Sequence, residues 1–399
     1  MMDDYSRRES MVFIIVIYTF CIQNSVKMDL DTKVNLITRN LQEVIGLDVL
    51  KKIVAVRPLK IYLGTAVTGK PHIGYLLQLL KIVDYLRAGC EVTVLFADLH
   101  AMLDSLKTTP GLIEARTEYY TKIIKSTLRA LGADIEQIKF VKGSDYQLTP
   151  EYTKDVYRFI THASIHDARK AGSEVVKQSE NPKLGDLMYP VLQALDEEYL
   201  GVDCQTGGVD QKKIFVFAAD YLPNIGYKKR IHLMTPMLKA IDAKCVSIVS
   251  DSEGTEIVEL DQDNENIQDT KMSSSNLNSK IDLLDTKNEV KKKINRAYCL
   301  EGDVSFNPLM ELVKLVLFPL LENQGIECFT IDRPVEFGGT LKYTDYNTLE
   351  KDFVEKLLHP QDLKLAVSSV LNNFLDKIRV DFADKESQKL LKKAYPAGK

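Results

Sequence analysis

The sequence predicts an α/β protein, in which a parallel sheet covered by helices is followed by a largely helical region. Two observations support this fold class. Short apolar runs alternate with stretches of helical periodicity over the first 250 residues, and this alternation is typical of βαβ units. From about residue 285 the pattern is mostly helical and is interrupted only by turn-forming segments, so the sheet belongs to the N-terminal part.

The elements of the first region follow in order. Residues 59–63 form an apolar run that ends at Gly64, and residues 73–88 have apolar side chains at helical spacing closed by Gly89, which predicts a strand and then a helix. The same reasoning predicts strands at 91–97, 138–141 and near 202, and helices at 112–131, 152–168, 187–200 and 211–219. We expect an N-terminal extension, a nucleotide-binding domain, an acidic connection with a Ser-rich loop, and a helical domain, over residues 1–27, 28–250, 251–284 and 285–399.

Length and composition are those of a globular enzyme. Of 399 residues, 45% are hydrophobic and 27% are charged, which allows a substantial core and argues against disorder. Six cysteines without a CxxC pair favour reduced thiols and a cytoplasmic protein. The net charge of −4 conceals eight acidic and no basic residues between positions 251 and 270. Without these eight charges the chain carries +4, which permits an RNA partner.

One apolar stretch, residues 11–22, is a candidate targeting segment. Its twelve residues are too few to cross a bilayer, and Asp3, Asp4 and Glu9 dilute the basic start that a signal peptide needs. We therefore expect no membrane partner. We favour a variable extension or a start-site artefact, with Met28 as the initiator, over a targeting segment.

The segment between the first strand and its helix, residues 64–75, reads GTAVTGKPHIGY. In a parallel sheet this position binds phosphates, because free backbone N–H groups and the helix dipole face the anion. His72 can donate a hydrogen bond to a phosphate oxygen, and Gly74 lets an adenine ring lie close to the backbone. Taken alone, however, such a histidine is more often a surface or capping residue.

A second motif, Lys271 followed by Met272 and three serines, lies about 200 residues later. A lysine and three hydroxyl groups can neutralise and hydrogen-bond a triphosphate, although the motif alone reads as an ordinary exposed loop. Together the two motifs resemble the HIGH and KMSKS signatures of class I aminoacyl-tRNA synthetases. The resemblance implies that His72 and Lys271 stabilise the transition state and that Mg²⁺ bridges the phosphates of ATP. The hydroxyls expected to hold the loop on pyrophosphate are those of Ser273, Ser274 and Ser275.

The predicted helix at 187–200 carries a polar stripe. Tyr189, Gln193 and Asp196 stand at i, i+4 and i+7 and therefore project from one face. This is either the wet face of an amphipathic helix or, in a nucleotide-binding domain, a pocket for a zwitterion with a hydroxyl. From about Asn35 onward the chain is similar to tyrosyl-tRNA synthetases of the eukaryotic and archaeal type. The matching blocks include KIYLGTAVTGKPHIGY, KGSDYQLTPEYTKDVYR, YPVLQALDEEYLGVDCQTGGVDQKKIF, KMSSS and HPQDLK.

This resemblance implies a Rossmann-type catalytic domain followed by an α-helical anticodon-binding domain, usually in a homodimer. It predicts that Tyr62 and Asp196 hydrogen-bond the phenol of bound L-tyrosine, and that its α-amino group is held by Tyr189, Gln193 and Gln211. The predicted ATP-binding residues are Gly64, Thr65, His72, Gly74, Gly207, Gly208, Asp210 and Met272. For Asp210, a helix cap just before Gln211 is the alternative role.

The implied reaction joins tyrosine and ATP into tyrosyl-adenylate and then transfers tyrosine to tyrosine tRNA. Positioning and charge stabilisation suffice for this chemistry, so no acid/base pair is required. Three other readings remain. A tryptophanyl-tRNA synthetase has no use for a hydroxyl-reading pair, a non-catalytic synthetase-like RNA-binding protein typically lacks one phosphate motif, and a small nucleotidylyltransferase lacks a helical RNA domain.

In the helical region, the segments around Phe337, His359 and Asp362 match those that hold the first anticodon base, a guanine, in this family. An aromatic face stacks an unpaired base, and a carboxylate accepts from guanine N–H groups. The alternatives are core packing for Phe337 and a helix N-cap for Asp362. A basic cluster is either a tRNA-backbone contact or a solvated face: Lys291, Lys292, Lys293 and Arg296. At Lys212 and Lys213 relatives often have Arg–Lys near the acceptor stem, and lysine in place of arginine loses the bidentate geometry of a base-specific contact.

The chain departs from the family pattern at residues 239–270, a connection that is longer than in relatives and acidic. Because it is polar and lacks strong periodicity, we expect it to be mobile.

Overall fold

The computed structural model describes residues 28–104, 108–176, 181–242, 272 and 279–396, together with the backbone of residues 247–250 and 256–259. The extension predicted for residues 1–27 lies outside the described residues.

The centre of the molecule is a six-stranded sheet in the order β1-β6-β5-β2-β3-β4. Strand β1 runs antiparallel to β6, and all the other neighbours are parallel, which confirms the predicted parallel sheet. Neither β1 nor β6 is among the strands predicted from the sequence. The strands are β1 (Glu43–Ile45), β2 (Lys60–Ala66), β3 (Glu91–Ala97), β4 (Ile138–Lys142), β5 (Cys204–Gly208) and β6 (Ile231–Thr235).

Strand β2 lies where the chain order reverses. From β2 the chain first adds β3 and β4 on one side, and later returns to place β5 and β6 on the other. In such sheets a ligand binds outside the carboxyl ends of the strands that flank the reversal. Here those ends are the last residues of β2 and β5, so the topology places a site there.

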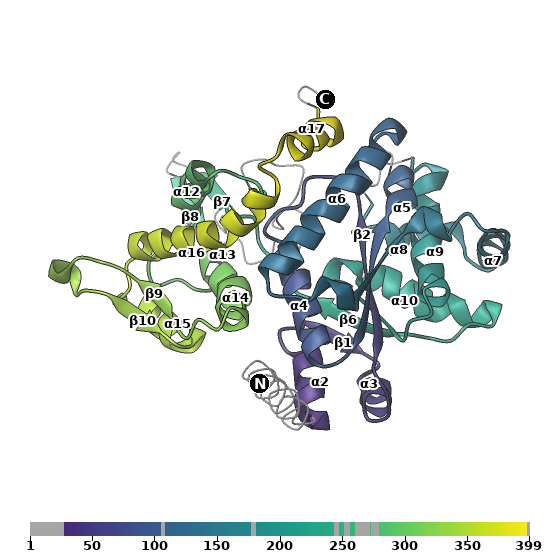
Figure 1. Ribbon diagram of the computed structural model, residues 1–399, viewed down its shortest axis with the longest axis horizontal. Helices are drawn as coiled ribbons and strands as arrows, with labels where there is room; N and C mark the ends of the chain where they lie inside the picture. The colour runs from purple at the N-terminus through teal and green to yellow at the C-terminus, as the bar shows by residue number, and fades with distance from the viewer. Residues whose placement is uncertain are drawn as a thin grey trace, which may run out of the picture.

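Helices cover both faces of this sheet (Figure 1). Along β2, Ile61 and Leu63 pack into one apolar cluster and Tyr62, which points the opposite way, packs into another. The single helix predicted at 152–168 is wrong, because the structure has two helices there. Ser164 caps the second one by accepting from the N–H of Asp167 at 3.1 Å. The helices of this part are α2 (Leu30–Thr38), α3 (Leu47–Val54), α4 (Tyr75–Arg87), α5 (Asp98–Leu103), α6 (Pro110–Ala130), α7 (Pro150–Ile160), α8 (Ile165–Gly172), α9 (Leu184–Tyr199) and α10 (Lys212–Tyr221).

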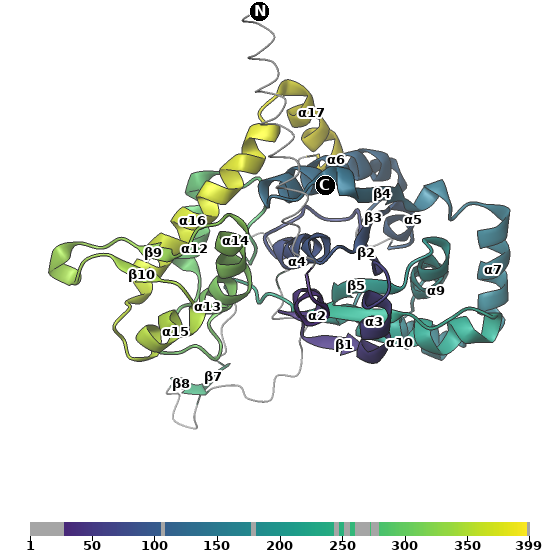
Figure 2. The same ribbon diagram turned by 60° about the horizontal axis from the view of Figure 1, so that its bottom comes forward.

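The C-terminal part is mostly helical, as predicted, but it also contains a small antiparallel sheet of β9 (Phe329–Ile331) and β10 (Leu341–Tyr343). Its long helix α16 (Pro360–Asp381) leads into α17, which lies against α6 (Figures 1 and 2). The other helices are α12 (Lys287–Arg296), α13 (Pro308–Leu312), α14 (Phe318–Asn323), α15 (Tyr346–Val354) and α17 (Lys385–Ala394), and a π-helical turn covers Val313–Leu317.

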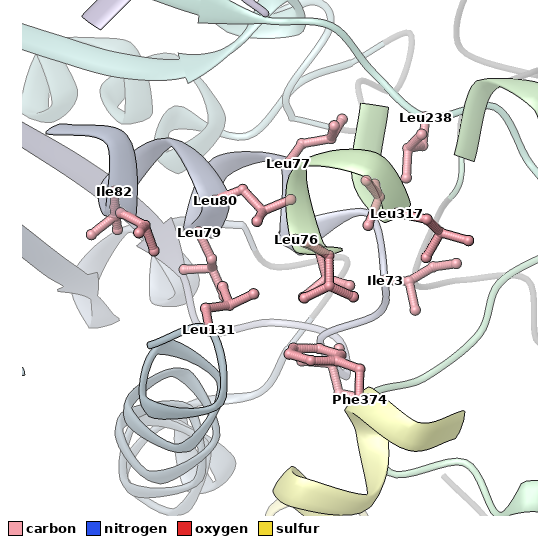
Figure 3. Close-up of a cluster of buried hydrophobic side chains, with 14 of the residues drawn as sticks. Ile73, Leu76, Leu77, Leu79, Leu80, Ile82, Leu131, Leu238, Leu317 and Phe374 are labelled. Carbon is pink, nitrogen blue, oxygen red and sulfur yellow. The ribbon is translucent and has the colours of Figure 1, made fainter. Parts of the chain in front are cut away.

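A single apolar cluster connects the two parts. Figure 3 shows Leu76 and Leu80 of α4 beside Leu317 and Phe374 of the C-terminal part. All four side chains are at most 5% exposed, and the cluster to which they belong extends from Leu36 to Ala394. The domain boundaries at residues 250 and 285 therefore stay a prediction, because the core does not divide there.

Part of the long acidic connection has regular structure. Strands β7 (Ser247–Ser250) and β8 (Glu256–Glu259) pair antiparallel (Figure 2), a hairpin that the expectation of a mobile connection did not include. The stretches 243–246, 251–255 and 260–271 lie outside the described residues. Within the part of the chain that the structure describes, no helix combines the length and apolarity needed to span a membrane.

Candidate functional site

A cavity of about 510 Å³ opens at the carboxyl ends of β2 and β5, where the topology predicts a site. The structure brings the residues predicted to bind tyrosine together in its wall: Tyr62, Tyr189, Gln193, Asp196 and Gln211. Most residues predicted to bind ATP line it too: Gly64, Thr65, His72, Gly74, Gly207, Asp210 and Met272. Gly208, the last residue of β5, is not part of the cavity wall. A Cβ at this position would come within 2.6 Å of Asp210 Oδ1.

Helix α9 presents Asp196 at the closed end of the cavity, where its side chain is 1% exposed. Its Oδ1 accepts three hydrogen bonds, from the hydroxyl of Tyr146 at 2.7 Å, Nε2 of Gln147 at 2.7 Å and the hydroxyl of Tyr152 at 3.1 Å. Its Oδ2 has no hydrogen-bond partner among the described residues, and His100 Nε2 lies 3.7 Å from it. A buried carboxylate oxygen of this kind is available to accept a hydrogen bond from a donor that enters the cavity.

Burial also controls the ionisation of this end of the cavity. It raises the pKa of Asp196 to about 7, although the hydrogen bonds from Tyr146, Gln147 and Tyr152 act in the opposite direction. Burial lowers the pKa of His100 to about 3, so its imidazole is neutral and does not form an ion pair with Asp196.

Tyr62 of β2 lies opposite this carboxylate on the same face of the sheet as α9. Its ring is fully buried, and its hydroxyl donates to the backbone oxygen of Gln193 across a long 3.3 Å. Such a weak bond leaves the hydroxyl free to turn toward a ligand oxygen. Acceptor and donor groups thus meet at the closed end.

The next turn of α9 forms a second polar group. Gln193 Nε2 donates to Gln211 Oε1 at 3.2 Å, and Gln211 Nε2 donates to Asp210 Oδ1 at 3.4 Å. The ring of Tyr189 stands edge-on to His100 with centroids 4.7 Å apart. The helix-cap alternative for Asp210 is wrong, because the N-cap of α10 is Gln211 and no side chain caps it.

The loop that carries His72 is fixed by the segment after the second motif. The N–H of Ile73 donates to the oxygen of Ile281 at 2.9 Å, and the N–H of Leu283 donates to the oxygen of Pro71 at 3.2 Å. His72 is only 7% exposed, so its reading as a surface residue is wrong. Burial, together with the charge of Lys280, lowers the pKa of His72 to about 3.

The hydrogen of this neutral imidazole can be assigned. Nδ1 of His72 accepts from the N–H of Gly74 at 3.2 Å, so the hydrogen is on Nε2, which is free to donate. A Cβ at Gly74 would lie 2.8 Å from the imidazole, so this bond requires glycine there.

The two nucleotide motifs meet in space. The sulfur of Met272 lies 3.9 Å from where a Cβ of Gly74 would stand, and the N–H of Met272 donates to the oxygen of Leu238 at 2.9 Å. Met272 of the second motif therefore lies next to Gly74 of the first motif. Its other predicted residues lie outside the described residues: Lys271, Ser273, Ser274 and Ser275.

Sequence reasoning missed the side chains that hold Asp196. Tyr146, Gln147 and Tyr152 lie in the block KGSDYQLTPEYTKDVYR, which carries part of the family resemblance but no predicted site residue. Within that block, the signal is a cluster of hydroxyl and amide donors directly after the strand predicted at 138–141.

The predicted anticodon residues lie at an exposed corner of the C-terminal part. Phe337 is 67% exposed, so the core alternative is wrong for it. His359 is the N-cap of α16, accepting from the N–H of Gln361 at 3.1 Å, and Asp362 stands in the first turn and is not the cap. Arg333 connects the two segments by donating to the oxygens of Gly339 and Leu357 at 2.8 and 3.1 Å.

The basic clusters divide between structural and exposed lysines. Lys293 is held by Asp285 at 2.6 Å, whereas Lys291, Lys292 and Arg296 of the same helix are exposed. Lys212 pairs with Glu43 at 2.8 Å, and Lys213 pairs with Glu174 at 2.9 Å.

Comparison with known proteins identifies the family. The family model described as tRNA synthetases class I (W and Y) matches residues 55–270 and 265–376. The chain belongs to the class I tRNA synthetases. This membership confirms the fold class and the family resemblance predicted from the sequence.

The individual relatives are named tyrosine–tRNA ligases or tyrosyl-tRNA synthetases. The chain is 51% identical over 91% of its length to the cytoplasmic tyrosine–tRNA ligase of Gallus gallus, of which it spans 63%. It is 46% identical to the Saccharomyces cerevisiae enzyme of the same name, over 90% of this chain and 87% of that one. The structure of Archaeoglobus fulgidus tyrosyl-tRNA synthetase complexed with L-tyrosine matches with a TM-score of 0.76 at 34% identity, covering 88% of this chain and 99% of that chain. The chain thus spans less than two thirds of its vertebrate relatives.

Proposed function

We propose that this class I tRNA synthetase is a cytoplasmic tyrosine–tRNA ligase. One observation carries the proposal: the buried Oδ2 of Asp196, without a partner among the described residues, lies at the closed end of the cavity together with the hydroxyl of Tyr62. A phenol donates one hydrogen bond and accepts another, so it satisfies both groups, whereas phenylalanine satisfies neither and the indole of tryptophan can only donate. The names of the relatives agree with this assignment.

The remaining groups of the cavity fit the rest of the amino acid. The α-amino group of tyrosine would be held by Tyr189, Gln193 and Gln211, which form one polar set a turn away from Asp196. Its carboxylate then faces the carboxyl ends of β2 and β5, where the glycines leave the backbone open to ATP.

Chemistry in this arrangement is the attack of the tyrosine carboxylate on the α-phosphorus of ATP, with pyrophosphate leaving. His72 would donate from Nε2 to a phosphate oxygen as negative charge develops, and Lys271 with Ser273, Ser274 and Ser275 would hold the leaving pyrophosphate. Mg²⁺ would arrive as MgATP, held by the phosphates. Among the described residues, no group of three His, Cys, Asp or Glu side chains could hold a metal ion.

The second substrate is tyrosine tRNA. Phe337 offers an exposed face for stacking the first anticodon base, and Asp362 offers a carboxylate in the first turn of α16. Exposed Lys291, Lys292 and Arg296 are suited to the phosphate backbone, whereas the paired lysines of α10 are less available for it.

We further infer a homodimer formed through α7. Leu148, just before this helix, is 68% exposed, and Tyr157, on the helix, is 65% exposed. Both line a shallow apolar groove with Pro150. Ile165, the first residue of α8, is 74% exposed. Large apolar side chains gathered in this way on a surface are typical of a protein–protein contact.

The test is amino-acid-dependent ATP–pyrophosphate exchange with tyrosine, phenylalanine or tryptophan. We expect exchange with tyrosine alone, and its loss in Asp196→Ala. Asp220→Ala, an exposed carboxylate on α10, is the matched control and should exchange like the unchanged protein. Folded protein that exchanges with no amino acid, or equally with phenylalanine, would contradict the proposal.

A further inference from the structure

Two tyrosine hydroxyls from distant parts of the chain converge on one backbone oxygen. The carbonyl oxygen of Gly69 accepts from the hydroxyl of Tyr395 at 2.8 Å and from the hydroxyl of Tyr120 at 2.5 Å. Tyr395 directly follows α17 and is 326 positions from Gly69 in sequence, and Tyr120 belongs to α6. Neither residue lines the cavity itself.

Gly69 is part of the cavity wall. It lies in the loop between β2 and α4, four residues after Thr65 and three before His72, all of which line the cavity. The hydroxyl of Tyr75, another lining residue, is 3.3 Å from that of Tyr120. The position of the Gly69 carbonyl therefore affects the loop on which ATP is proposed to lie.

Tyr395 is itself held firmly. Its ring meets Tyr119 edge-on with centroids 5.3 Å apart, and the guanidinium of Arg116 lies 4.9 Å from the ring centroid. Nε of Arg116 also donates to the oxygen of Ala394 at 3.2 Å. The hydroxyl thus reaches Gly69 from a fixed support on α6, and not from a loose chain end.

The same support continues toward the opposite end of the molecule. Lys122 of α6 pairs with Asp384 at 3.3 Å, where α16 has just ended and α17 begins. Helix α16 has 22 residues and so extends about 33 Å back to His359 at its N-terminus. Figures 1 and 2 show α17 against α6 with α16 leading away from it.

We propose that Tyr395 is a positioning residue for ATP: its hydroxyl holds the Gly69 carbonyl and thereby sets the nucleotide loop between β2 and α4. The inference rests on the proposed function, because it assigns ATP to this loop. It adds a residue from the C-terminal part to those that act in the activation step. This effect can be measured without tRNA.

The test is steady-state ATP–pyrophosphate exchange without tRNA, comparing the unchanged protein with Tyr395→Phe. This variant keeps the ring against Tyr119 and Arg116 and removes only the hydroxyl. Since one hydrogen bond is lost, we expect the KM for ATP to rise about three- to tenfold. The KM for tyrosine should stay within about 1.5-fold, because the tyrosine end of the cavity lies on other elements. The same limit should hold for kcat, because the backbone bonds of Pro71 and Ile73 to the segment 281–283 hold His72 without Tyr395.

Tyr343→Phe is the matched control. Its hydroxyl donates to Asp352 Oδ2 at 2.9 Å within the C-terminal part, away from the nucleotide loop, so its KM for ATP should not change. A merely structural role of Tyr395 would reduce the active fraction, which lowers apparent kcat and leaves both KM values unchanged. That result, or an unchanged KM for ATP at full kcat, would overturn the inference.

Failure of the proposed function is a different outcome. If the unchanged protein shows no tyrosine-dependent exchange, the proposed function is contradicted, and calorimetric titration with MgATP decides the inference alone. Weaker MgATP binding by Tyr395→Phe than by the unchanged protein would support it, and equal binding, or no MgATP binding by the unchanged protein, would overturn it.

Discussion

Tyr146 donates its phenolic hydrogen to Oδ1 of Asp196 across 2.7 Å, and this contact determines which oxygen of the carboxylate faces a ligand. With Gln147 and Tyr152 also directed at Oδ1, a proton taken up by Asp196 has only Oδ2 to occupy. The pH therefore decides whether Oδ2 carries a proton.

Tyrosine binding should depend on pH near neutrality. The pKa of Asp196 is raised to about 7 by burial, so a falling pH protonates Oδ2 and removes the acceptor for the phenol. We expect the KM for tyrosine to rise as pH falls below about 7, approaching tenfold per pH unit at the acid limit. Exchange kinetics between pH 5.5 and 8.5 measure it. Asp196→Asn should show a high KM for tyrosine that does not vary with pH, and a flat profile in the unchanged protein would refute the assignment.

His72 should act as a neutral donor. Because its pKa is lowered to about 3, kcat should show no step caused by His72 between pH 5 and 8. Removing a donor that acts on developing charge typically lowers kcat by about 10²–10³, so we expect this loss for His72→Ala with the KM for tyrosine nearly unchanged. His162→Ala, an exposed histidine after α7, is the control. A kcat for His72→Ala equal to that of the control would show that the donor has no role.

Charges on the α7 face should separate the proposed dimer. In Leu148→Lys/Tyr157→Lys, two exposed apolar side chains of the groove become cationic, and like charges would meet across a two-fold interface. Light scattering should report half the mass of the unchanged protein. Val56→Lys changes an 81% exposed side chain next to α3 and should leave the dimer intact. A monomeric unchanged protein, or a double variant that stays dimeric, would reject this face.

Anticodon variants should affect only the tRNA step. Loss of stacking on Phe337, or of the carboxylate of Asp362, should raise the KM for tyrosine tRNA about tenfold or more, while exchange without tRNA stays normal. Aminoacylation kinetics with Phe337→Ala and Asp362→Ala measure this. Asp381→Ala, at the other end of α16, should behave like the unchanged protein. Equal KM values for all three variants would place anticodon reading elsewhere.

Local patterns predicted much of the site, and long-range contacts were missed. The stripe of Tyr189, Gln193 and Asp196 follows from helical spacing alone, and the loop around His72 follows from its place between a strand and a helix. The donors of Asp196 become its neighbours only when the loop after β4 and helix α7 pack on α9. Tyr395 meets Gly69 only when α17 returns to α6. No spacing rule connects such segments.

Two errors in the fold have similar causes. The sequence pattern does not predict β6, because His232 interrupts its apolar run. His232 is nevertheless fully buried, and its Nε2 lies 2.7 Å from Oε1 of Glu197. A polar pair that is hydrogen-bonded inside the core does not look apolar in the sequence. The break between α7 and α8 depends on the Ser164 cap, which the continuing apolar periodicity conceals.

The apolar cluster that runs from Leu36 to Ala394 also determines how the molecule comes apart. Since Phe374 of α16 and Leu76 of α4 share it, neither the sheet nor the helices of the C-terminal part keep a complete interior when the other is lost. Heating should therefore produce one cooperative calorimetric transition, with equal calorimetric and van't Hoff enthalpies, instead of two separate meltings.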